Sequence, residues 1–126
     1  MIKAKNTIVA TGVIFDERTK AVSIFNIIED LIVGGFPTFI QQLSLFSYFT
    51  REAGDQSKIL LKLVIKNNEK EIANENIDVN FQDKLKNRTR IEFSAMPIFE
   101  EGKVVFSIMN QTETLSEYEI SVKKLG

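Results

Sequence analysis

The sequence has 126 residues and a formal net charge of −1, and it contains neither cysteine nor histidine. A chain of this length forms one domain around one hydrophobic core, and its near-neutral charge creates no overall field that would attract nucleic acid or an anionic membrane. Without cysteine and histidine it can build no disulfide, no zinc site of the usual kind and no histidine-dependent catalytic triad. We therefore expect a single domain over residues 1–126 that is not an enzyme and holds no metal or cofactor.

The N-terminal segment contains lysines followed by the apolar run IVATGVIF, as a secretory signal does. Thr11 and Gly12 interrupt this run, the acidic pair Asp16–Glu17 follows it, and there is no small-residue cleavage site. No stretch reaches the roughly 18 to 20 apolar residues that a membrane-spanning helix needs. The sequence thus predicts a cytoplasmic protein that starts at Met1 and does not enter a membrane.

Turn-forming segments divide the chain at regular intervals. They lie at residues 16–19, 34–38, 51–56, 67–71, 99–103 and 110–113. The runs between them are short and rich in Ile, Val, Phe and Thr, which is typical of strands in a sandwich or barrel.

The segment VSIFNIIEDLIV, residues 22–33, allows two interpretations. A helix is supported by the spacing of Ile24, Ile27, Ile28 and Leu31. Against a helix, six of the twelve residues are Val or Ile, which lose rotamer freedom in a helix, and no capping residue precedes Val22. We favour a strand that is apolar on both faces, with the inward face changing at a bulge marked by Asn26 or Glu29–Asp30.

The next run, FIQQLSLFSYF at residues 39–49, is also apolar on both sides. Leu43 and Leu45 are predicted to face the core, which leaves Phe46 and Tyr48 on the opposite face. The outer face of a two-layer sandwich normally meets water, so this excess is either an interaction surface or is covered by bulges and the loop 34–38. The predicted interface, for a protein partner or a second copy in a homodimer, consists of Phe25, Phe36, Phe39, Phe46 and Tyr48.

The second half of the chain shows clearer alternation. Residues 58–66 place Ile59, Leu61, Leu63 and Ile65 on one face and lysines on the other. Residues 90–96, 103–109 and 117–124 repeat this pattern, with Ile91, Phe93, Ala95, Tyr118, Ile120 and Val122 predicted to point inward. The turns between them predict antiparallel hairpins. The pattern of residues 77–81 predicts a short strand, followed by one helical turn over 81–85.

A row of cations is the sharpest local feature. Lys84, Lys86, Arg88 and Arg90 recur at a spacing of two, so an extended backbone would place them along one face. Such a row can bind a small anionic molecule, or it can be a solvated face or a protected sheet edge. Nucleic acid is disfavoured because no aromatic residues alternate with these cations.

Acidic pairs recur in predicted loops or at strand ends, at residues 16–17, 29–30 and 100–101. None has the dense carboxylate spacing of a calcium loop, so we interpret them as hydrophilic turns. A glycosidase is disfavoured because the chain has no Trp and only two Tyr to stack against sugar rings.

Two stretches resemble an uncharacterised bacterial family of small β-sandwich proteins. The first, SIFNIIEDLIVGGFPTFIQQLSLFSYF, carries Ser23, Phe25, Asn26, Ile27, Phe36 and Pro37. The second, MPIFEEGKVVFSIMNQTETLSEYEISVKK, carries Pro97, Gly102, Phe106, Ile108, Tyr118, Ile120 and Val122. The chain departs from the family at Glu101–Gly102, where the family often has Pro-Gly. The family has no assigned activity, so the resemblance implies a fold and leaves the function open.

The sequence therefore predicts an all-β, immunoglobulin-like β-sandwich of seven to eight mostly antiparallel strands. The predicted function is a non-catalytic protein-interaction or structural module that self-associates through an apolar face of residues 22–49. The alternative is a small-molecule or anion-binding domain that uses the row from Lys84 to Arg90.

Overall fold

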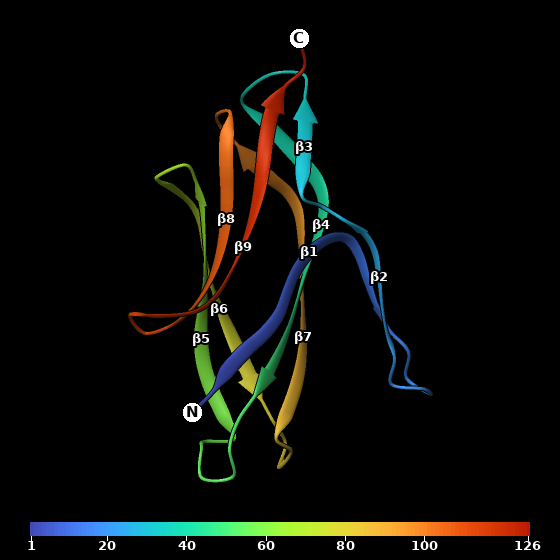
Figure 1. The fold of residues 1–126 in the computed structure, drawn as a ribbon, viewed down its shortest axis with the longest axis vertical. Helices are drawn as coiled ribbons and strands as arrows, with labels where there is room; N and C mark the ends of the chain where they lie inside the picture. The colour runs from blue at the N-terminus through green and yellow to red at the C-terminus, as the bar shows by residue number, and fades with distance from the viewer.

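The computed structural model describes all 126 residues and contains nine strands and no helix (Figure 1). The strands are β1 (Lys3–Phe15), β2 (Val22–Ile27), β3 (Asp30–Val33), β4 (Thr38–Thr50), β5 (Lys58–Asn67), β6 (Lys70–Asn80), β7 (Lys86–Ile98), β8 (Gly102–Asn110) and β9 (Glu113–Lys124). The prediction of an all-β fold is confirmed, with nine strands in place of seven to eight. The structure therefore has no helix that is long and apolar enough to cross a membrane.

The strands form two sheets that pack face to face. One has four strands in the order β2-β1-β4-β7, and the other has five in the order β3-β9-β8-β5-β6. All neighbouring strands are antiparallel except β3 and β9, which run parallel. The strand order from β4 onward matches B, C, C′, E, F and G of an immunoglobulin domain, with B beside E and with G, F, C and C′ in the facing sheet. The fold is therefore an immunoglobulin-like β-sandwich.

Residues 22–33 are extended, so the strand interpretation is confirmed and the helical alternative is wrong. They form two strands rather than one with a bulge, because the chain leaves the four-stranded sheet after β2 and enters the five-stranded sheet as β3. At the crossing, the Ile28 amide donates to Val9 and the Glu29 carbonyl accepts from Ser121, which ties it to both sheets. Ile28 and then Leu31 face the core, so the inward face does change at the predicted position, Glu29–Asp30.

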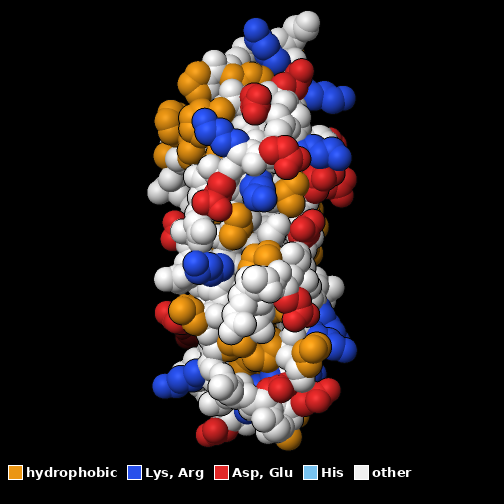
Figure 2. Space-filling model, turned by 90° about the vertical axis from the view of Figure 1, so that its left-hand side faces the viewer, with side chains coloured by type: hydrophobic (Ala, Val, Ile, Leu, Met, Phe, Trp, Pro, Cys, Tyr) orange, Lys and Arg blue, Asp and Glu red, His pale blue; other side chains and the backbone are white.

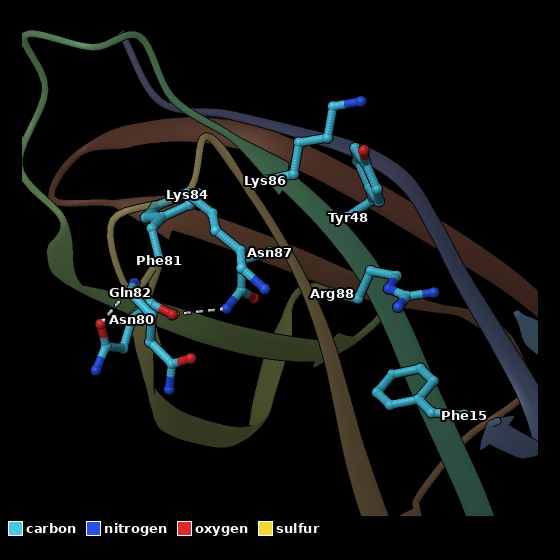
Figure 3. Close-up of a pocket in the computed structure, with 9 residues that line it drawn as sticks. All are labelled: Phe15, Tyr48, Asn80, Phe81, Gln82, Lys84, Lys86, Asn87 and Arg88. Atoms are coloured by element: carbon cyan, nitrogen blue, oxygen red, sulfur yellow. Dashed lines mark hydrogen bonds between the residues drawn. The ribbon is translucent and has the colours of Figure 1, made fainter. Parts of the chain in front are cut away.

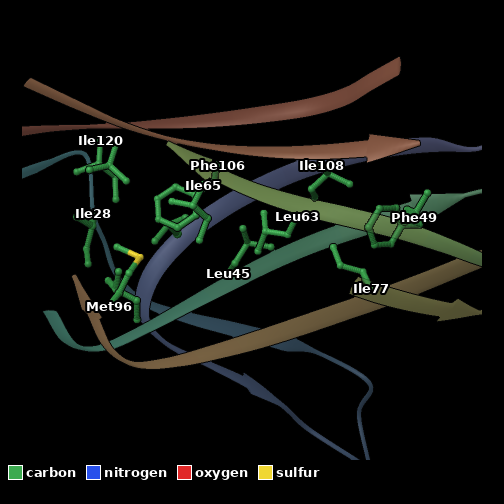
Figure 4. Close-up of a cluster of buried hydrophobic side chains, with 14 of the residues drawn as sticks. Ile28, Leu45, Phe49, Leu63, Ile65, Ile77, Met96, Phe106, Ile108 and Ile120 are labelled. Carbon is green, nitrogen blue, oxygen red and sulfur yellow. The ribbon is translucent and has the colours of Figure 1, made fainter. Parts of the chain in front are cut away.

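The core lies between the sheets and is almost entirely aliphatic and phenylalanine (Figure 4). Leu61, Leu63 and Ile65 of β5 are completely buried, as their alternation predicts. The prediction that Ala95 points inward is wrong. Its φ of 60° is in the left-handed region, so the alternation of β7 shifts there, and Met96 and Ile98 enter the core instead.

The β1–β2 hairpin, residues 12–25, is an addition to the immunoglobulin core. The first part of β1 pairs with β4 as far as Ala10, and the remainder pairs only with β2. In Figure 1 this hairpin projects to the right, on the side away from β5 and β6. The side of the molecule that carries β5 and β6 shows interspersed acidic and basic side chains, with hydrophobic ones gathered at the upper left of the view and in smaller groups below (Figure 2).

Candidate functional site

The β1–β2 hairpin is fastened to the outer face of the β4–β7 pair. The ring of Phe15, at the end of β1, meets the edge of Phe46 in β4 at a centroid distance of 6.1 Å. The guanidinium groups of Arg88 and Arg90 in β7 lie 5.6 and 5.4 Å from the centroid of the Phe15 ring. Because Phe15 lies against all three side chains, the hairpin covers part of a sheet face that would otherwise meet water.

Backbone hydrogen bonding adds to this attachment. Arg90 Nη1 donates to the carbonyl oxygen of Val13 at 2.9 Å, and Arg88 Nη1 donates to the carbonyl oxygen of Lys20 in the hairpin loop. At the tip, the carboxylate of Asp16 accepts the backbone N–H groups of Arg18 and Thr19 at 2.8 and 2.9 Å. These two bonds hold the pKa of Asp16 below its ordinary value, and the bond from Thr19 makes the larger contribution.

This arrangement corrects the predicted apolar interface. Phe46 is only 6% exposed because the hairpin covers it, so the prediction that it lies on an open docking face is wrong. Phe36 packs against the core, and Tyr48 is half-buried. Phe25 and Phe39 are 49% and 57% exposed, but Phe25 lies in β2 and Phe39 lies at the start of β4, opposite Pro97. The five residues therefore do not form one continuous surface.

A smaller apolar group, which the sequence did not predict, surrounds Phe25. The register of the hairpin pairs Gly12 with Phe25, Ile14 with Ser23 and Ala10 with Ile27. Ile14 and Ile27 are 54% and 53% exposed, like Phe25 between them. Gly12 lies beside the Phe25 ring, and a Cβ at this position would make an ordinary van der Waals contact with it at 3.8 Å. We call Ile14, Phe25 and Ile27 the hairpin patch. This group follows from the register that pairs residues 10–15 with 22–27, which the sequence analysis did not predict.

Strand β2 is also a free sheet edge that carries no charged residue. Its sequence is VSIFNI, and it pairs only with β1. The other three edges each contain charge: β7 has Lys86, Arg88, Arg90 and Glu92, β6 has Lys70, Glu71, Glu75 and Asp78, and the four-residue β3 begins with Asp30. Charged side chains and short strands are the usual protection against pairing at an edge, and β2 lacks the first.

The basic row is divided between two environments. Lys84 lies in the β6–β7 loop, while Lys86, Arg88 and Arg90 lie in β7. Arg90 pairs with Glu92 at 3.6 Å and, like Arg88, holds the hairpin. The prediction that all four residues form one free cationic row is therefore wrong for Arg90, whose charge has an internal partner.

The remaining three cations line the largest pocket, of about 480 Å³. We call it the basic pocket. Its walls are Phe15, Tyr48, Asn80, Phe81, Gln82, Lys84, Lys86, Asn87 and Arg88. Figure 3 shows Asn80, Phe81, Gln82 and Lys84 at one end and Phe15 with Arg88 at the other. No carboxylate lines this pocket, and no Asp or Glu lies within 4.0 Å of the charged nitrogens of its cations.

The structure contains no group of three acidic side chains arranged to hold a metal ion. The side chains whose pKa departs clearly from its ordinary value are Asp16, Asp55 and Tyr118. Hydrogen bonds lower the pKa of the two aspartates, and burial raises the pKa of Tyr118. None of the three lines the basic pocket.

Comparison with known proteins shows similarity in fold alone. No family model and no curated protein matches the sequence. Among solved structures, the alkylpurine DNA glycosylase AlkC of Pseudomonas fluorescens, bound to DNA with an abasic site analogue, matches 97% of this chain and 30% of its own, at 11% identity and a TM-score of 0.54. A β-glucosidase from Listeria innocua in complex with glucose matches 98% of this chain and 16% of its own, at 10% identity and a TM-score of 0.54.

The chain thus spans less than a third of each of these enzymes. An immunoglobulin-like protein from Pseudomonas aeruginosa matches 98% of this chain and 97% of its own, at 12% identity and a TM-score of 0.45. The fold assignment rests on the strand order described above. The chain is an immunoglobulin-like β-sandwich for which no family is shown.

Proposed function

We propose that this protein is a non-catalytic interaction module that self-associates through the free edge of β2 and the adjoining hairpin patch. The observation that carries the proposal is the uncharged edge of β2, beside three large apolar side chains that are each about half exposed. An exposed edge strand presents unpaired N–H and C=O groups, which an extended segment of another chain can satisfy.

A second copy of the chain suits this edge better than a charged partner. Two β2 strands related by a twofold axis run antiparallel, and neither brings a charge that would repel its equivalent. Such pairing would join two four-stranded sheets into one continuous sheet. Asn26 has a φ of 55°, which interrupts regular pairing, so Val22–Phe25 is the stretch available for backbone bonds.

The pairing would also cover apolar surface. Ile14, Phe25 and Ile27 flank the edge, and their removal from water is favourable at about 25 cal/mol per Å². The strand edge and the hairpin patch together bury only a small area, so we expect a dimer of micromolar rather than nanomolar affinity. The similarity to parts of larger enzymes is compatible with a module of this kind. As part of the same proposal, the protein is a member of the uncharacterised bacterial β-sandwich family that it resembles, and it acts in the cytoplasm.

Sedimentation velocity at micromolar concentration tests the proposal. We expect a concentration-dependent dimer for the wild type and a monomer for Phe25→Lys, because a lysine in each β2 would place like charges across the twofold axis. The side chain of Phe25 is outside the core, so this variant should retain its circular dichroism spectrum and thermal stability.

Phe39→Lys is the matched control, since Phe39 is equally apolar and exposed but lies in β4. It should dimerise like the wild type. A wild type that stays monomeric up to high micromolar concentration, or a Phe25→Lys variant that still dimerises, would show that β2 is not the interface.

A further inference from the structure

We propose that the basic pocket binds a small ligand with several phosphate groups, an oligophosphate. This site is independent of the proposed self-association, because none of the nine residues that line the pocket belongs to β2 or to the hairpin patch. Its volume of about 480 Å³ lies within the range of roughly 300–1,000 Å³ typical of small-molecule sites.

The charge of the pocket selects an anion with more than one negative group. Lys84, Lys86 and Arg88 bring three positive charges without a carboxylate among the lining residues. Arg90, two residues after Arg88 in β7, differs from these three cations because its charge is paired with Glu92 at 3.6 Å. Unpaired cations beside one another repel, so a multivalent anion that lies between them relieves this repulsion and gains charge-assisted hydrogen bonds.

The loop that carries Lys84 is held in place by the fold and not by the lysine itself. Arg51 Nε donates to the carbonyl oxygen of Lys84 at 2.8 Å, and the Arg51 amide donates to the carbonyl oxygen of Leu85 at 3.0 Å. The Lys84 amide closes a turn on the carbonyl oxygen of Phe81 at 2.9 Å, and Phe81 is buried under the Arg51 guanidinium. A ligand would therefore meet a loop that needs little ordering on binding.

Arg88 is held at the other end of the pocket. One of its Nη atoms donates to the carbonyl oxygen of Lys20, and its guanidinium lies over the Phe15 ring. A guanidinium has five N–H donors, so this bond leaves others for an oxyanion. Lys84 in the loop and Lys86 at the start of β7 are both exposed, so their side chains can adjust to contact a ligand in the pocket.

Polar uncharged groups complete the lining. Asn87 Nδ2 donates to the carbonyl oxygen of Asn80 at 3.0 Å, which ties β7 to the end of β6. The backbone N–H of Gln82 donates to Asn80 Oδ1 at 3.0 Å. Gln82 and Asp83 have φ values of 51° and 64°, a left-handed pair that reverses the chain beside the pocket. The amide side chain of Gln82 makes no hydrogen bond within the protein, so its two N–H donors are available to phosphate oxygens.

Isothermal titration calorimetry with sodium tripolyphosphate is the direct test. We expect binding with a dissociation constant below about 1 mM in low salt, weakened roughly tenfold in moderate salt because phosphate contacts are salt-dependent. Parallel titrations with ATP and adenosine identify the source of the phosphates. Tripolyphosphate and ATP should bind alike, and adenosine should not bind.

The double variant Lys84→Gln/Lys86→Gln should bind tripolyphosphate at least about tenfold more weakly. Lys62→Gln/Lys66→Gln, which removes the same charge from exposed positions on β5, should bind within about twofold of the wild type. An unchanged circular dichroism spectrum shows that both variants fold. In amide NMR spectra, tripolyphosphate should shift the side-chain signals of Asn80, Gln82 and Asn87.

Three results would overturn the proposal: no heat and no NMR shifts at millimolar tripolyphosphate, equal weakening in the two double variants, or tighter binding of adenosine than of tripolyphosphate. Each leaves the sedimentation experiment on β2 unaffected. A monomeric wild type that binds tripolyphosphate would in turn reject self-association and keep the pocket.

Discussion

At the scale of single residues, buried polar side chains take over hydrogen bonds that the strands cannot make. Asn67, at the end of β5, is completely buried, and its Oδ1 accepts the N–H groups of Phe99 and Glu100 at 2.9 and 3.0 Å. Its Nδ2 donates to the carbonyl oxygens of Glu100 and Lys103. The buried amide of Asn67 thus bonds four backbone groups of the turn between β7 and β8, and the neighbouring Asn68 bonds Glu101 and Lys103 of the same turn.

Tyr118 has a comparable role at the crossing between sheets. Its hydroxyl donates to the carbonyl oxygen of Ile28 at 2.5 Å. Burial, with a smaller contribution from the charge of Glu29, raises the pKa of Tyr118 above its ordinary value of 10.0. A raised pKa means that the folded state favours the neutral phenol. This stabilisation is complete below pH 10 and is lost as the pH rises through the folded-state pKa.

We predict that Tyr118→Phe lowers the free energy of unfolding by about 1 kcal/mol near neutral pH, the usual net value of one hydrogen bond. The difference between wild type and variant should shrink as the pH rises above 10, because ionised Tyr118 no longer stabilises the wild type. Urea unfolding at neutral and alkaline pH measures both effects. Tyr48→Phe is the control, since the Tyr48 hydroxyl makes no hydrogen bond within the protein; an equal loss in both variants would contradict the assignment.

At the scale of elements, the β1–β2 hairpin depends on side chains far away in the sequence. Phe15 packs against Phe46, Arg88 and Arg90, and β2 makes regular backbone pairs only with β1. A two-stranded hairpin is barely stable alone in water, so contact with the β4–β7 face is what keeps this one ordered. The same contact buries Phe46 and places Phe15 in the wall of the basic pocket.

We predict that Phe15→Ala loosens the hairpin while the sandwich stays folded. Loss of a half-buried ring should cost about 1 to 2 kcal/mol, and amide hydrogen exchange should accelerate in residues 12–25 but not in β5 or β8. Phe99→Ala is the matched control. Phe99 also lies under a cation, Lys70 at 4.9 Å, but fastens no other strand. Equal protection of residues 12–25 in wild type and Phe15→Ala would refute this account of the hairpin.

At the scale of the whole molecule, a chain of hydroxyl groups complements the apolar core. Thr7 Oγ1 in β1 lies 2.9 Å from Ser47 Oγ in β4, and Ser116 Oγ in β9 donates to Thr7 Oγ1 at 2.7 Å. The second bond joins the two sheets at the side where β1 and β9 meet. Thr7 and Ser47 are buried, so neither hydroxyl can find water if its partner is removed.

We predict that Ser116→Ala lowers the free energy of unfolding by about 1 kcal/mol, because Thr7 loses its partner across the sheets. Chemical unfolding followed by both circular dichroism and tyrosine fluorescence should remain a single transition, since the sheets share one core. Ser107→Ala is the control, because its hydroxyl reaches only Glu117, at 3.5 Å and near the surface. A control that loses as much stability would show that the Ser116 bond has no special role.

The sequence by itself determined the fold class, and the reason is local. Alternation with a period of two in residues 58–66, 90–94 and 117–124, with turn residues between the runs, has no other packed solution than strands in layers. A change of inward face within residues 22–33 was also predicted, because side-chain polarity along a strand indicates which side is buried, but Asn26 and Glu29–Asp30 were both candidates for its position. The spacing of two drew attention to Lys84, Lys86 and Arg88 as part of an alternative anion-binding row, but it assumed an extended backbone throughout, whereas Lys84 lies in a loop.

Only the tertiary structure decided which of these surfaces are free. Phe46 and Phe25 are equally apolar in the sequence, yet the hairpin covers Phe46 and leaves Phe25 exposed. Arg88 and Arg90 have the same charge, yet Glu92 pairs with Arg90 alone. The left-handed Ala95 shifts the alternation of β7 without any polarity signal. Polarity shows which side chains avoid or seek water, but contacts between distant strands decide which ones meet it.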